Sequence, residues 1–469
     1  MRPFEIALTI ALVLAALIDL ISATRKIRFF AAFLCLVLLA IHLVYEGGHW
    51  QMLPVYLAAI VLIFTSSKRK PDAPASRKTS PMVILALCVL GGGLSYAIPM
   101  FSFPKPTGPY PVGTRILYLR DDSRKEDAGT DRSRSRELIV QVWYPAEPSR
   151  NHLAPYRRWS ESKLKNSYQS VLWTNSREDA PIASGQEPFP LILLGHGWGA
   201  TRISDTFLAE DLASQGYVVV AADHPYNSGR VAFPDGRVID GIPNSPIIDL
   251  GIEPADKTEA LWNMELQKWT ADQLFVLNSL QTANLDSQSF WYRRLNTNLV
   301  GALGHSFGGS AALRICSLDP RVRSAINMDG WTFDGIRDRL SGKPIMFMYE
   351  VDADPQRTQL HSPFPGARVN AELDDLDSKN VLSNLEKFGG YKLVIEGAMH
   401  ADFTDQPMVS PFHRITHTGP IKPVRMQTIV RDYALAFFNK TLRGESSPLL
   451  DSGNTSPFKE VHFEQWPAP

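Results

Sequence analysis

A glycine-flanked serine is the first feature of this sequence that could do chemistry. In the stretch GALGHSFGGS, Ser306 lies between Gly304 and Gly308 in the spacing Gly-x-Ser-x-Gly. The apolar run Leu299–Leu303 precedes it, and the helix-compatible segment Ser310–Cys316 follows. A strand, a tight glycine turn and a helix expose a serine as a nucleophile. A plain strand-to-helix turn is the alternative, so the rest of the chain has to decide.

A serine nucleophile also needs oxyanion donors. The backbone N–H of Phe307, at the start of the expected helix, is the first donor that we predict. Upstream, GHGWGA at residues 195–200 follows the apolar run Phe189–Leu194. This segment resembles the His-Gly-rich loop that supplies the second donor in α/β-hydrolases. We predict that donor to be the backbone N–H of Trp198; a simple connecting loop is the alternative.

The serine further requires a base and a carboxylate, which α/β-hydrolases carry after the nucleophile in the order acid, then histidine. His400, in VIEGAMHADFTD, follows an apolar run late in the chain and is the predicted base. The acid has two candidate positions. Asp329 follows SAINM, whereas Asp352 and Asp354 follow PIMFMY. Either strand end could place a carboxylate beside the histidine, so position alone leaves both open.

Short apolar runs alternate with helix-compatible segments from about residue 114 onward. The expected strands are Leu138–Tyr144, Phe189–Leu194, Tyr217–Ala222, Leu299–Leu303, Ala325–Met328, Pro344–Tyr349 and Tyr391–Glu396. The expected helices are Ile203–Gln215, Thr258–Leu280, Ser310–Cys316 and Pro423–Leu442. This alternation predicts an α/β fold with a mostly parallel sheet flanked by helices. Functional residues of such sheets gather at the carboxyl ends of the strands.

Two stretches do not fit this alternation. Ser149–Pro188 is polar and aromatic, and Tyr226–Asp256 is rich in Gly, Pro, Asn and Asp. We interpret both as loop insertions that form a rim or a lid. The Pro/Gly-rich segment Ser102–Thr114 is a linker. The predicted domains are therefore an anchor at residues 1–102 and a catalytic domain at 103–469.

The first hundred residues contain four apolar runs. They are Phe4–Ala23, Phe29–Tyr45, Trp50–Thr65 and Met82–Phe101. Two have the roughly 20 residues that cross a hydrocarbon core, and the middle two are shorter. A cleaved signal peptide would account only for the first run. We therefore predict about four transmembrane helices and a lipid bilayer as a partner.

Loop charge predicts the orientation of these helices. Eight basic residues follow the first and third runs, namely Arg25, Lys26, Arg28, Lys68, Arg69, Lys70, Arg77 and Lys78. The opposite side carries only Arg2. Because basic loops stay in the cytoplasm, everything after Phe101 is expected on the extracytoplasmic side.

Overall composition excludes some other classes of function. Lys+Arg and Asp+Glu balance at 48 each, so no net charge favours nucleic acid. The 3 cysteines lack the spacing of a disulfide framework or a metal site. We therefore expect no nucleic-acid partner, no metal and no organic cofactor.

Five motifs in order resemble the plasma-type platelet-activating factor acetylhydrolases and the bacterial esterases related to them. They are LGHGWGATR, AADHPYN, LGHSFGGSAA, NMDGWTF and AMHADFTD, within about residues 107–442. The resemblance implies an α/β-hydrolase fold, with the acid in a Met-Asp-x-Trp context. Residues 328–331 match that context, which favours Asp329 over Asp352. The family's His-x-x-Phe pattern maps onto His400 and Phe403, whereas the multi-span N-terminus departs from the secreted members.

The expected function is a serine carboxylic-ester hydrolase that acts through an acyl-enzyme. Trp198, Phe307 and Trp331 would line the site with apolar walls, which suits a short acyl chain or a lipid-like ester. One alternative is a serine peptidase or amidase on the same fold. Another is a membrane sensor or transport protein with an inactive hydrolase domain.

Overall fold

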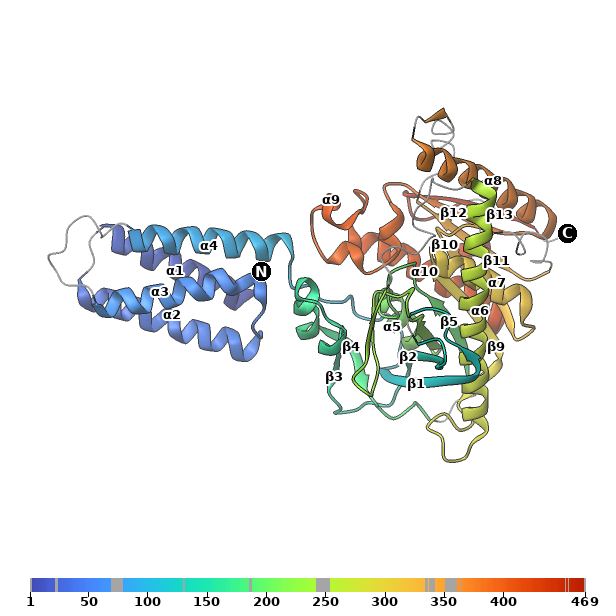
Figure 1. Ribbon diagram of the computed structural model, residues 1–469, viewed down its shortest axis with the longest axis horizontal. Helices are drawn as coiled ribbons and strands as arrows, with labels where there is room; N and C mark the ends of the chain where they lie inside the picture. Colours follow the sequence, from blue (N-terminus) through green and yellow to red (C-terminus); the bar gives the residue numbers. More distant parts are fainter. Residues whose placement is uncertain are drawn as a thin grey trace. The chain divides into compact units, whose positions relative to one another are not determined.

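The computed structural model describes residues 2–467 except 22–23, 69–78, 130, 185–187, 242–253, 334–335, 337–341, 351–360, 363, 452 and 454. The chain forms two compact units (Figure 1). The first contains residues 1–102, 155–173 and 407–416, and the second contains 103–154, 174–406 and 417–469. Two later segments thus belong to the same unit as the N-terminal helices.

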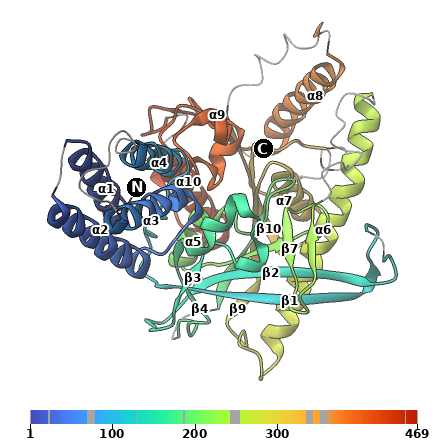
Figure 2. The same cartoon turned by 60° about the vertical axis from the view of Figure 1, so that its left-hand side comes forward.

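Four helices that lie side by side make up most of the first unit (Figures 1 and 2). They are α1 (Pro3–Ile21), α2 (Arg25–Tyr45), α3 (Leu53–Lys68) and α4 (Thr79–Ala97). Three described helices are long and apolar enough to cross a membrane: Pro3–Ile21, Lys26–Tyr45 and Thr79–Ala97. The third predicted run is divided, because its first turn is the 3-10 helix η1 (Trp50–Met52) and α3 has only 16 residues.

Small side chains fill the centre of this helical unit. Ala15, Ala58 and Cys88 are buried between the helices. A Cβ on Gly91 of α4 would lie 2.6 Å from Cγ2 of Val55 in α3, so these helices approach closely. Large apolar side chains face outward, and they include Phe29, Phe30, Phe33, Leu90 and Val89. Small residues inside and large apolar residues outside are typical of helices packed within lipid.

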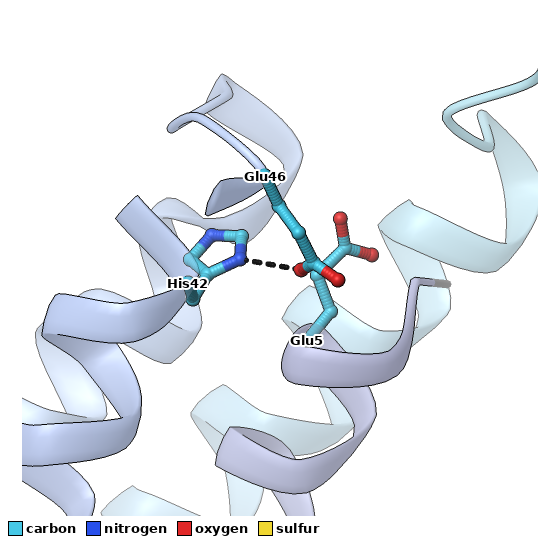
Figure 3. Close-up of side chains that lie close together, drawn as sticks. All are labelled: Glu5, His42 and Glu46. Atoms are coloured by element: carbon cyan, nitrogen blue, oxygen red, sulfur yellow. Dashed lines mark hydrogen bonds and ion pairs between the residues drawn. The ribbon is translucent and has the colours of Figure 1, made fainter. Parts of the chain in front are cut away.

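A polar network joins α1 to α2 within the same unit. Glu5, His42 and Glu46 point toward one another (Figure 3), and His42 Nδ1 lies 2.9 Å from a Glu46 carboxylate oxygen. These residue types can ligate metals. The Arg2 guanidinium, however, pairs with Glu5 at 2.6 Å, and His49 Nε2 lies 3.0 Å from the same Glu5 oxygen. We therefore interpret the cluster as an ion-pair network and assign no metal to it.

An eleven-stranded sheet forms the centre of the second unit, in the order β13-β12-β11-β10-β9-β5-β6-β2-β1-β4-β3. Its strands are β1 (Val112–Lys125), β2 (Ser135–Pro145), β3 (Leu153–Pro155), β4 (Trp173–Glu178), β5 (Phe189–Gly195), β6 (Val218–Asp223), β9 (Leu295–His305), β10 (Val322–Met328), β11 (Ile345–Tyr349), β12 (Gly390–Ile395) and β13 (Val461–Trp466). Neighbours from β6 through β12 are parallel, and β2 and β13 join antiparallel. A separate hairpin pairs β7 (Arg230–Ala232) with β8 (Val238–Asp240).

Helices cover both faces of the sheet. α5 (Thr206–Ser214) and α10 (Pro423–Arg443) pack together on one face. α6 (Ala255–Leu285), α7 (Phe307–Leu318) and α8 (Pro365–Phe388) lie on the other (Figure 2). Shorter helical turns of this unit are η6 (His400–Phe403) and α11 (Pro448–Asp451). The turns η3 (Trp159–Glu161), η4 (Leu164–Val171) and α9 (His413–Thr416) belong to the first unit, and η7 (Gln406–Met408) crosses the chain boundary between the two units. The predicted α/β class, with its mostly parallel sheet, is confirmed.

All seven expected strands form, within a residue or a few at their ends. The expected strands did not include the full length of β1, whose charged outer half is mostly exposed apart from the buried Asp121. The sequence also did not predict β13, an edge strand, or α8. The stretch at 149–188 contains β3, η3, η4 and β4. The stretch at 226–256 contains the β7–β8 hairpin, and its residues 242–253 are not among the described residues.

Candidate active site

Ser306 occupies a sharp turn between β9 and α7. Its backbone has φ 54° and ψ −125°, a left-handed conformation that a residue with a side chain rarely adopts. Its N–H donates to the carbonyl of Met328 at 2.8 Å, which ties the turn to the end of the neighbouring strand β10. The Ser306 side chain is partly exposed among buried neighbours. The turn therefore presents the hydroxyl at the carboxyl edge of the sheet.

Three glycines allow this turn because their backbones touch. A Cβ on Gly304 would lie 2.3 Å from the carbonyl carbon of Gly308, and one on Gly308 would lie 2.2 Å from the Gly195 oxygen. Strand β5 ends at Gly195, which is in register with Gly304 of β9. Any side chain at these positions would separate the two strand ends from the first turn of α7. These close backbone contacts require glycine on both sides of Ser306. Such tight packing favours a nucleophile turn over a plain strand-to-helix connection.

Asp329 and His400 meet beside this turn. His400 Nδ1 lies 2.5 Å from Asp329 Oδ2. Asp329 directly follows β10 and also has a positive φ of 59°, and His400 begins η6 after β12. The Asp329 side chain is 10% exposed and the His400 side chain 49%. The carboxylate is thus held inside, and the imidazole faces the open side of the site.

Two further contacts position His400. The buried His305, which precedes Ser306, donates its Nε2–H to the His400 carbonyl at 2.7 Å. The two imidazole rings lie 4.5 Å apart, so the backbone of η6 is fixed against the serine turn. The backbone N–H of Glu350 donates to Asp329 Oδ1 at 3.4 Å, which orients the other carboxylate oxygen toward His400.

The charges around His400 raise its pKa. Burial alone would lower it, but the hydrogen bond and charge of Asp329, together with the charge of Glu350, outweigh that effect. Burial and the Asp329 charge in turn raise the pKa of Glu350 to about 7. The site therefore favours an imidazolium once His400 has taken up a proton, as a general base requires.

The two predicted oxyanion donors belong to segments that adjoin Ser306. The Phe307 N–H opens α7, where the helix dipole places partial positive charge. The loop that carries Trp198 also runs close to the serine, since a Cβ on Gly197 would lie 3.3 Å from the Ser306 Cβ. The Trp198 and Phe307 rings meet edge-on at 5.4 Å. A carbonyl oxygen bound between these backbones would be enclosed by aromatic rings.

Helix α6 supplies aromatic contacts that the sequence analysis missed. Trp262 packs against Trp198 at 5.2 Å and against Phe307 at 5.0 Å. Trp269 packs against Phe307 at 4.9 Å. The two tryptophans are seven residues apart and therefore share one helix face. The seven-residue spacing, visible in the sequence, could have predicted that both tryptophan rings face the same side of α6.

Trp331, the tentative pocket residue, is half-buried two residues after Asp329. Its indole N–H donates to Asp374 of α8 at 2.8 Å, and its ring lies 5.9 Å from that of Phe333. Contacts with Asp374 and Phe333, and not with the proposed triad residues, therefore fix the orientation of the Trp331 ring. The alternative acids, Asp352 and Asp354, lie outside the described residues.

This fold and this arrangement define an α/β-hydrolase. The family model for platelet-activating factor acetylhydrolase, isoform II, matches residues 97–447. The chain belongs to that family and is a carboxylic-ester hydrolase.

Relatives and a solved structure agree with this assignment. The chain is 24% identical to a probable 1-alkyl-2-acetylglycerophosphocholine esterase of Arthroderma benhamiae, over 80% of this chain and 98% of the relative. It is 26% identical to the platelet-activating factor acetylhydrolase of Canis lupus familiaris, over 52% and 59% of the two chains. A ferulic acid esterase from Streptomyces cinnamoneus has a similar structure, with a TM-score of 0.60, 29% identity and coverage of 78% and 99%.

Proposed function

We propose that Ser306, His400 and Asp329 form the catalytic triad of this esterase. The contact between His400 Nδ1 and Asp329 Oδ2 at 2.5 Å carries the proposal, because it joins a base to an acid beside a serine on a strained turn. His400 takes the proton from Ser306 as the oxygen attacks the ester carbonyl. Asp329 holds the imidazole in the required tautomer and stabilises the imidazolium.

The tetrahedral intermediate places its oxyanion between the backbone N–H groups of Trp198 and Phe307. Collapse expels the alcohol, which takes the proton from His400 and leaves an acyl group on Ser306. Water, activated by the same imidazole, then attacks the acyl-enzyme and releases the acid. Each step uses residues of this chain alone.

The proposed substrates are short-acyl or lipid-like esters. The relatives' names include an ester with an acetyl group on a glycerophosphocholine, and the similar structure is an esterase of an aromatic acid. The aromatic rings of Trp198 and Trp331 are the apolar walls that we assign to the acyl or leaving group. Aromatic walls of this kind suit the apolar part of an ester.

Hydrolysis by the full chain in detergent micelles tests the triad. p-Nitrophenyl acetate, butyrate and decanoate would be compared with an acyl p-nitroanilide. Ser306→Ala should reduce ester turnover by at least about 10³-fold. Ser317→Ala, at the far end of α7, is the matched control and should keep normal turnover. Equal rates for Ser306→Ala and Ser317→Ala would refute the nucleophile, and faster anilide than ester hydrolysis would favour an amidase.

We also propose that four spans anchor the chain and that the hydrolase unit works on the extracytoplasmic side. The support is the excess of basic residues after the first and third apolar runs. Alkaline phosphatase fused after residue 469 should be active in cells, and a fusion ending at residue 68 should be inactive. The reverse pattern would place the hydrolase unit in the cytoplasm.

A further inference from the structure

We propose that Ser228 and His196 form a buried hydrogen-bond relay that orients the oxyanion-binding peptide between Gly197 and Trp198. The relay rests on the proposed function, because it acts on the peptide whose N–H we assign to the oxyanion. Neither residue faces the reacting atoms, so both are positioning residues. Both are also enclosed, with 1% of His196 and none of Ser228 exposed.

The direction of each hydrogen bond follows from the donors present. The backbone N–H of His224 donates to Ser228 Oγ at 2.7 Å. The Ser228 hydroxyl hydrogen is therefore available for His196 Nε2, which lies 2.9 Å away. With Nε2 as an acceptor, a neutral His196 carries its proton on Nδ1. That nitrogen lies 2.7 Å from the Gly197 carbonyl oxygen and donates to it.

The Gly197 carbonyl belongs to the same peptide group as the Trp198 N–H. The C=O and N–H of a trans peptide point in opposite directions. Two donors hold this oxygen, the His196 imidazole and the backbone N–H of Ala200 at 3.0 Å. Fixing the oxygen fixes the direction of the Trp198 N–H, and polarising the carbonyl strengthens that N–H as a donor.

The segment that carries Ser228 is itself anchored. Asn227 accepts from the Gly199 N–H through its carbonyl at 2.9 Å and from the Trp269 indole through its side chain at 3.1 Å. His224 Nδ1 bonds Asp272 at 2.8 Å, and its ring stacks on Trp269 at 3.9 Å. The relay thus connects the oxyanion loop to α6 through groups that water does not reach.

The protonation state of His196 fits this role. Burial, with the neighbouring His224 adding to it, lowers the pKa of His196 to about 4. The ring is therefore neutral at ordinary pH, with Nε2 able to accept from Ser228. A cationic His196 would have no lone pair for that hydroxyl, and the relay would break.

The test measures transition-state binding separately from folding. Ser228→Ala removes the hydroxyl, and His196→Phe keeps a ring against Trp269 but removes both nitrogens. Active sites in each full-chain preparation are counted by complete labelling with a fluorophosphonate, so misfolded protein lowers the count and not the rate per site. Ser324→Ala is the matched control, since Ser324 is equally buried and bonds Thr441 at 2.8 Å.

We expect kcat per labelled site to fall about tenfold in Ser228→Ala, with KM nearly unchanged. That loss is smaller than the ~10²–10³-fold effect of deleting an oxyanion donor, because the N–H is misdirected and not lost. Affinity for a trifluoromethyl ketone, which forms a tetrahedral adduct, should fall in the same proportion as kcat/KM. His196→Phe should show an equal or larger loss, and Ser324→Ala none.

Unchanged kcat per site and unchanged ketone affinity in Ser228→Ala and His196→Phe would overturn the relay and leave the triad intact. A proportional rise in KM with constant ketone affinity would also overturn it, because that pattern reports altered ground-state binding. If Ser306→Ala is the only variant that loses fluorophosphonate labelling, the proposed function is supported, whether or not the relay proposal holds. Full activity in Ser306→Ala would remove the proposed function itself.

Discussion

Replacing Asp329 by asparagine should reverse the tautomer of His400. The backbone N–H of Glu350 bonds Asp329 Oδ1 at 3.4 Å and can bond only an acceptor. The asparagine oxygen would therefore stay at that position, and its NH₂ would replace Oδ2, which lies 2.5 Å from His400 Nδ1. An NH₂ donates, so Nδ1 would become an acceptor and the proton would move to Nε2. The nitrogen that should accept the Ser306 proton would then already carry one.

The expected loss is large at the chemical step. The same change in the triad of a serine protease lowers kcat by about 10⁴, and a loss of about 10³–10⁴ corresponds to about 4–5.5 kcal/mol. Burst kinetics with p-nitrophenyl acetate on the full chain would separate acylation from binding, and KM should change little. Asp319→Asn is the matched control, because Asp319 is also a buried carboxylate with a cationic partner, Arg321 at 2.6 Å.

Asp352→Asn tests the alternative acid in the same assay. We expect it to keep activity near that of the wild type. A loss under tenfold in Asp329→Asn, or a larger loss in Asp352→Asn than in Asp329→Asn, would refute the assignment of the acid. A comparable loss in Asp319→Asn would show that the assay reports folding and not the tautomer.

Three further predictions concern charge, packing and stability. The proposed base, His400, must be neutral to accept a proton and its pKa is raised, so kcat/KM should fall as the pH decreases through a value above the usual 6.5. Glu350→Gln removes one charge that raises this pKa, so the acid limb should move to lower pH, and an unmoved limb would contradict the coupling. Gly308→Ala would place a Cβ 2.2 Å from the Gly195 oxygen and should abolish folded, active protein, whereas Gly93→Ala, with no atom within 4 Å, should give normal yield and turnover. Asp272→Asn removes a buried carboxylate that lies 2.7 Å from Arg136 and should lower the free energy of unfolding by about 3–5 kcal/mol, seen as a lower thermal midpoint in detergent. An unchanged midpoint would mean that Glu126 alone compensates the charge of Arg136.

The sequence was sufficient to propose catalytic residues where a reactive side chain stands directly after a predicted strand. Ser306, Asp329 and His400 each follow an apolar run, and parallel strands bring their carboxyl ends to one edge. Position did not decide between Asp329 and Asp352; only the resemblance to a family favoured one. The 2.5 Å contact now supports that choice on geometry, and substitution is the direct test.

Other parts of the site could not be predicted because they depend on long-range contacts with no local pattern. The ring contact between His305 and His400 joins residues 95 positions apart, and the bond from Arg136 to Asp272 spans 136 positions. The division of the third apolar run was also missed. Pro54 lacks an N–H and suits the first turn of a helix, so α3 begins near it and the preceding residues form η1.

In the proposed mechanism, the buried polar groups behind the loop that carries Trp198 fix the direction of an oxyanion donor, which a triad alone cannot do. A backbone N–H is an effective oxyanion donor only if its direction is fixed before the reaction, since reorientation during the step would add to the barrier. Gly197 and Gly199 flank Trp198 and give its peptide more conformational freedom than other residues would. The Gly197 side is held by His196, and the Gly199 side by the carbonyl of Asn227. The glycines allow the loop to pass close to Ser306, and the polar network removes the freedom that those glycines introduce.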